Sequence, residues 1–72
     1  MADDEIMQWI RGAVPHDENG RIIISGEAVF AMETRYPGET LSHKFRLAQA
    51  ETLLIAARQA GMEKEVNRLL HK

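Results

Sequence analysis

The chain contains no cysteine, which excludes disulfide scaffolds and zinc sites built on thiolates. Proline and glycine are scarce, with 2 and 5 residues among 72, so a collagen-like or low-complexity chain is excluded as well. Long apolar runs are also missing, because the longest holds five residues and a membrane-spanning helix needs about 20. The N-terminal sequence is acidic, unlike a secretion or transit signal. We therefore expect a cytoplasmic protein that does not contact membranes.

What is present is the composition of one small globular domain covering residues 1–72, with 44% hydrophobic and 28% charged residues. A chain of this length buries only about 60% of its extended-chain surface when it folds. Its core is expected to supply only about 3–5 kcal/mol of net stability, and small natural domains often add oligomerisation to that. We therefore expect self-association or docking on a larger protein.

The residues that could act in catalysis or bind a metal do not form a recognisable motif. His16, His43 and His71 are not paired at helical spacing, and no metalloprotease motif is present. Ser42 and His43 are adjacent on an expected helix, so their side chains point in different directions and do not form a nucleophile–base pair. The five glycines are isolated, so no phosphate-binding loop is expected. The sequence predicts no enzyme activity, no metal site and no cofactor.

The N-terminal third predicts one helix followed by a short extended segment. Asp3 can cap the helix, and Pro15 marks its end. Asn19-Gly20 is a strong turn signal, and the three isoleucines after it favour an extended segment at about 21–25. The stretch before the turn is charged and contains proline, so we expect no hairpin partner for this segment.

The rest of the chain predicts three more helices. Ser25 is a suitable cap for a helix from Gly26 to about residue 36, which Pro37-Gly38 ends. A long helix is expected from about residue 40 to 60, with Gly61 as its left-handed cap. A short amphipathic helix is expected after it. The expected fold is therefore mainly α, a small bundle of about four helices with one short extended segment.

The long helix shows two apolar faces, whereas a helix at the surface of a monomer normally shows one. Leu47, Ala50, Leu54 and Ala57 on the second face follow heptad-like spacing, and the alanines permit close approach of another helix. Two interpretations stay open. The other helices cover both faces within one chain, or one face forms the core and the other an interface.

By elimination, the sequence suggests a small non-enzymatic binding or regulatory protein of the inhibitor or adaptor type. Compact chains of this kind include proteins of phages and other mobile elements, an analogy that rests on size alone. We expect a protein partner, with a homodimer as the simplest case. The predicted interface residues are Leu47, Ala50, Leu54, Ala57, Met62, Val66, Leu69 and Leu70.

Charge is distributed unevenly and provides an alternative function. Residues 1–34 hold seven acids and two arginines, and residues 35–72 hold seven Lys or Arg and four acids. The two parts can neutralise each other, within the fold or across a dimer. Alternatively, a basic patch beside an aromatic can bind DNA or RNA, although a pI of about 5.9 argues against phosphates as the main ligand. That patch would comprise Arg35, Tyr36, Lys44, Arg46 and Arg58.

Overall fold

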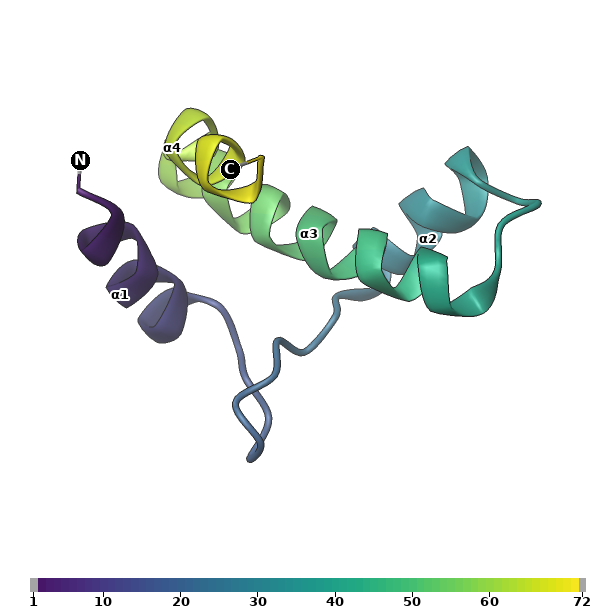
Figure 1. Ribbon diagram of the computed structural model, residues 1–72, viewed down its shortest axis with the longest axis horizontal. Helices are drawn as coiled ribbons and strands as arrows, with labels where there is room; N and C mark the ends of the chain where they lie inside the picture. The colour runs from purple at the N-terminus through teal and green to yellow at the C-terminus, as the bar shows by residue number, and fades with distance from the viewer. Residues whose placement is uncertain (1, 72) are drawn as a thin grey trace.

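A computed structural model describes residues 2–71 and places four helices in them. They are α1 (Asp3–Ala13), α2 (Gly26–Arg35), α3 (Leu41–Ala60) and α4 (Glu63–Leu70). Of the described residues 70% are helical, so the expected mainly α fold with about four helices is confirmed. The long helix α3 forms the spine: α2 lies against its N-terminal half, and α4 and α1 lie at its other end (Figure 1).

The helix ends follow the sequence signals closely. The Ser25 hydroxyl accepts a hydrogen bond from the Ala28 backbone N–H at 3.1 Å, and the Thr40 hydroxyl accepts one from His43 at 3.2 Å. These contacts satisfy amide groups that have no partner inside the helix. Gly61 ends α3 in the left-handed conformation, with φ of 73°. The expected capping roles of Ser25 and Gly61 are confirmed.

The start of α1 differs from the expectation. Asp3 is the first helical residue and not the cap, because Ala2 occupies the capping position without a side-chain hydrogen bond. The Asp3 carboxylate still lies in the first turn, where it suits the positive end of the helix dipole. It also faces Arg68 of α4 at 3.5 Å, so its contact is with another helix.

The expectation that the extended segment lacks a hairpin partner is wrong. His16 and Ile22 form a single antiparallel β-bridge across the Asn19-Gly20 turn. The Asp17 carboxylate closes this turn by accepting the backbone N–H groups of Asn19 and Arg21, both at 2.9 Å. Gly20 adopts a φ of 79°, which explains the need for glycine there. The hairpin is too short to produce a strand pattern in the sequence.

Two apolar clusters line α3, one at each end. The first core cluster joins α1, α4 and the C-terminal half of α3. Its buried members are Ile6, Ile10, Val14, Leu53, Ala57 and Val66. The second core cluster is smaller and joins α2 to the first half of α3 through Ala28, Met32 and Ala48. Since each end of α3 has its own packing partners, both of its apolar faces are covered over much of their length.

None of the helices found in residues 2–71 combines the length and the hydropathy that crossing a membrane would require.

Candidate protein-binding surface

Most of the predicted interface lies inside this chain. Ala57 and Val66 are 0% and 1% exposed and belong to the first core cluster. Leu54, Met62 and Leu69 are partly buried against the same cluster. Ala57 and Val66 thus have no surface to offer a partner, and their apolar character is explained by packing within the fold.

The other predicted interface residues keep some surface. Leu47 is half-buried against the second core cluster, and Ala50 is half-buried on α3. Leu70 is exposed near the C-terminal end. Leu47 and Ala50 lie on α3 and Leu70 lies at the end of α4, so the structure does not bring the eight predicted residues together on one face.

A different group of apolar side chains is exposed where α2 faces the first turns of α3. Leu41 is 77% exposed, Phe45 is 55% exposed and Val29 is 47% exposed. Together with Ile24, Met32 and Ala48 they line a pocket of about 150 Å³. We call these six residues the α2–α3 apolar surface.

The helical geometry explains why this surface is uncovered. Leu41 and Phe45 are four residues apart, so they lie on one side of α3 in consecutive turns. The helix α2 is half as long as α3, with 10 residues against 20, and its buried side chains on this side are Ala28 and Met32. These two side chains pack with Ala48, so the contact between α2 and α3 lies beside Leu41 and Phe45 and leaves both of them exposed.

An ion pair borders the α2–α3 apolar surface. Lys44 Nζ lies 2.9 Å from the Glu33 carboxylate, and both residues line the pocket. The Lys44 side chain is only 15% exposed, which indicates that its aliphatic stem packs against the protein. The pair leaves little net charge at this edge of the pocket.

Ion pairs also occupy most of the proposed nucleic-acid patch. Arg35 and Arg58 each lie 3.5 Å from the buried Glu51 carboxylate, and Lys44 faces Glu33. A hydrogen bond from Arg58 to Glu63, helped by the charges of Glu63 and Glu51, raises the pKa of the Arg58 guanidinium. Arg46 is exposed and, within residues 2–71, forms no ion pair.

The pairs Glu33–Lys44 and Asp3–Arg68 join the acidic N-terminal part to the basic C-terminal part. Mutual neutralisation within the fold therefore accounts for part of the charge asymmetry. Tyr36 is exposed beyond the end of α2. The patch is thus less basic than the sequence alone indicates.

Leu41 and Phe45 are not among the interface residues predicted from the sequence. Their position four residues apart at a helix start was visible in the sequence, but the side on which α2 packs decides whether they are covered. Among residues 2–71 the structure shows no group of three or more His, Asp or Glu side chains that could hold a metal ion.

Comparison with known proteins adds no relative: no family model, no curated protein and no solved structure matches this chain.

Proposed function

We propose that this chain is a small non-enzymatic binding protein that acts through protein–protein contacts, as an inhibitor or adaptor, and that it pairs with a second copy of itself. The observation that carries the proposal is the exposure of Leu41, Phe45 and Val29 around one pocket. Contiguous exposed apolar side chains bordered by polar groups are typical of protein interaction sites.

A second copy is the occupant that the structure favours. Two α2–α3 apolar surfaces can meet around a two-fold axis, because such an interface uses the same patch on both chains. The Glu33–Lys44 pair leaves little net charge at the rim, so two copies do not repel each other there. The small core also makes additional burial valuable, since domains of this size often gain stability by association.

The expected dimer is weak. Complete burial of a Leu or Phe side chain contributes about 1.5–3 kcal/mol, and these side chains are already partly covered in the single chain. Association costs about 4 kcal/mol or more in lost translational and rotational freedom. We therefore expect a dissociation constant between about 10 µM and 1 mM.

Sedimentation equilibrium of the wild type and of Phe45→Asp tests this proposal. The wild type should show a monomer–dimer equilibrium, and Phe45→Asp should weaken dimerisation about tenfold or more, because it places a carboxylate in the apolar contact.

Phe30→Asp is the matched control. Phe30 is 72% exposed and lies two residues from both Ala28 and Met32, so it points away from α3. This variant should dimerise like the wild type. A wild type that stays monomeric at about 1 mM, or equal effects of the two variants, would contradict the proposal.

The alternative of nucleic-acid binding has less support. Three of its four basic residues, Arg35, Lys44 and Arg58, face carboxylates, so binding to phosphates would have to compete with these pairs. Phosphate contacts contribute most of the non-specific affinity of nucleic-acid-binding proteins, which makes this competition costly.

A further inference from the structure

A cavity of about 700 Å³ lies between α1, the His16–Ile22 hairpin, α3 and α4. Its volume falls within the range of about 300–1,000 Å³ that is typical of pockets for small molecules. It is far larger than the pocket in the α2–α3 apolar surface and does not share a lining residue with it. The cavity is therefore a separate candidate site, independent of the proposed dimer contact.

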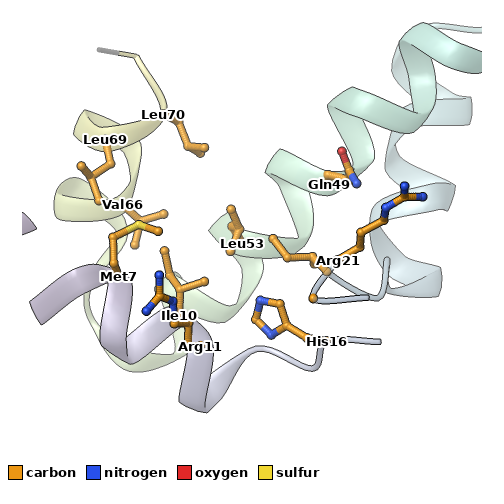
Figure 2. Close-up of a pocket in the computed structure, with 12 residues that line it drawn as sticks. Met7, Ile10, Arg11, His16, Arg21, Gln49, Leu53, Val66, Leu69 and Leu70 are labelled. Atoms are coloured by element: carbon orange, nitrogen blue, oxygen red, sulfur yellow. The ribbon is translucent and has the colours of Figure 1, made fainter. Parts of the chain in front are cut away.

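The two ends of this cavity differ in chemistry, as Figure 2 shows. Apolar side chains from α1 and α4 gather at one end, where Met7, Leu69 and Leu70 lie, and in this view the Arg11 guanidinium lies at the same end. The polar side chains of His16, Arg21 and Gln49 lie at the other end. Leu53 of α3 is placed between the two groups in this view, so an apolar wall connects them.

The charged residues around the cavity all carry the same sign. Arg11 and Arg21 are the only basic residues in residues 1–34, a stretch with seven acids, and both of them line the cavity. Within residues 2–71 no carboxylate lines the cavity and neither arginine forms an ion pair.

The acidic residues nearest to Arg21 in sequence do not pair with it. The Asp17 carboxylate is held inside the hairpin turn by the backbone N–H groups of Asn19 and Arg21. Glu18 is exposed and does not line the cavity. An arginine without a carboxylate partner beside an apolar wall favours a ligand that brings an anion and an apolar body together.

We propose that this cavity binds a single-chain amphipathic carboxylate of the fatty-acid class. The carboxylate accepts hydrogen bonds from Arg21, whose guanidinium lies on the Gln49 side of this end in Figure 2, since the planar guanidinium matches a carboxylate in two-point contact. The hydrocarbon chain passes Leu53 and is covered by Met7, Leu69 and Leu70. Arg11 adds a second positive charge that favours an anionic over a cationic amphiphile.

Calorimetric titration with laurate below its micelle concentration tests the proposal, with methyl NMR spectra to locate the ligand. Laurate should bind and shift the methyl signals of Leu53, Leu69 and Leu70. Dodecyltrimethylammonium carries the same chain with a cationic head and should bind at least about tenfold more weakly. Butyrate carries the head without the long chain and should not bind measurably.

Variants at each end of the cavity test the carboxylate contact and the hydrocarbon contact separately. Arg21→Gln should weaken laurate binding about tenfold, the effect expected for loss of one charge-assisted hydrogen bond. Arg46→Gln is the matched control, because Arg46 is exposed and does not line the cavity. Leu70→Glu should weaken binding through the apolar end, and circular dichroism checks that each variant folds.

Equal affinities for laurate and the cationic amphiphile, or equal effects of Arg21→Gln and Arg46→Gln, would overturn the proposal. Shifts confined to the α2–α3 apolar surface would do the same. A protein that does not bind laurate but sediments with phosphatidylserine vesicles would also overturn the proposal. In that case Arg11 and Arg21 would bind a membrane surface instead. None of these results depends on the oligomeric state, so the proposed ligand site and the proposed dimer can be refuted independently of each other.

Discussion

At the scale of single residues, Thr52 links the chain before α2 to the middle of α3. Its hydroxyl accepts a hydrogen bond from the Ser25 backbone N–H at 3.2 Å and donates one to the Ala48 carbonyl at 2.8 Å. Thr52 is buried, and Ser25 is half-buried and caps α2. Thr52 therefore helps to position α2, and with it the α2–α3 apolar surface, beside the packing of Ala28 and Met32 on Ala48.

Replacing Thr52 by valine should destabilise the protein by about 1–3 kcal/mol, because the Ser25 N–H loses its acceptor in a partly buried place. Urea denaturation measures the change in the free energy of unfolding. Thr34→Val is the control, since Thr34 is exposed and its hydroxyl bonds only to the Phe30 carbonyl. That variant should stay within about 0.5 kcal/mol of the wild type, and equal losses in both would refute the role of Thr52.

At the scale of elements, the helix ends decide how α3 meets α4. Gly61 adopts a positive φ, and its backbone N–H bonds to carbonyls in the last turn of α3. The turn directs α4 back toward α1, which closes the first core cluster around Val66. The exposed Gly12, in contrast, lies within α1, where any residue can adopt the helical conformation.

The same substitution at these two glycines should therefore have opposite effects. An added Cβ meets no atom within 4 Å at either position, so backbone conformation alone decides the outcome. Gly61→Ala should lower the stability by about 1–2 kcal/mol, the cost of a left-handed residue with a side chain. Gly12→Ala should raise the stability by about 0.5 kcal/mol, because alanine lowers the conformational entropy of the unfolded chain. Thermal denaturation of both variants measures the two signs, and a shared sign would contradict this explanation.

The sequence predicted the helices well because their ends carry local signals. Ser25 and Gly61 act through their own backbone neighbours, so three or four residues are enough to recognise them. The bridge between His16 and Ile22 could not be predicted, since one residue pair produces no periodicity and the Asp17 side chain supplies much of the turn.

The candidate sites were less predictable because they depend on which elements meet. The two apolar faces of the long helix were evident from the sequence, but whether another helix covers them depends on the tertiary arrangement. Ala57 and Leu41 illustrate this: both are apolar residues of α3, yet Ala57 is buried and Leu41 is exposed. The clustering of Arg11 and Arg21 at one cavity likewise requires the folded chain.

At the scale of the whole molecule, the fold divides into two ends with different properties. The end built from α1, α4 and the C-terminal half of α3 holds the larger core and the cavity lined by Arg11 and Arg21. The end built from α2 and the start of α3 has a smaller core and exposes Leu41 and Phe45. We infer that the first end maintains the fold and that the second makes contact with another protein chain.

Isotope-filtered NMR on a mixture of labelled and unlabelled protein at about 1 mM detects contacts between copies only, and so examines the proposed dimer contact itself. We expect intermolecular contacts between the Leu41 methyl groups of one copy and the Phe45 ring of the other. Intermolecular contacts confined to Met62, Leu69 and Leu70, or none at this concentration, would contradict it.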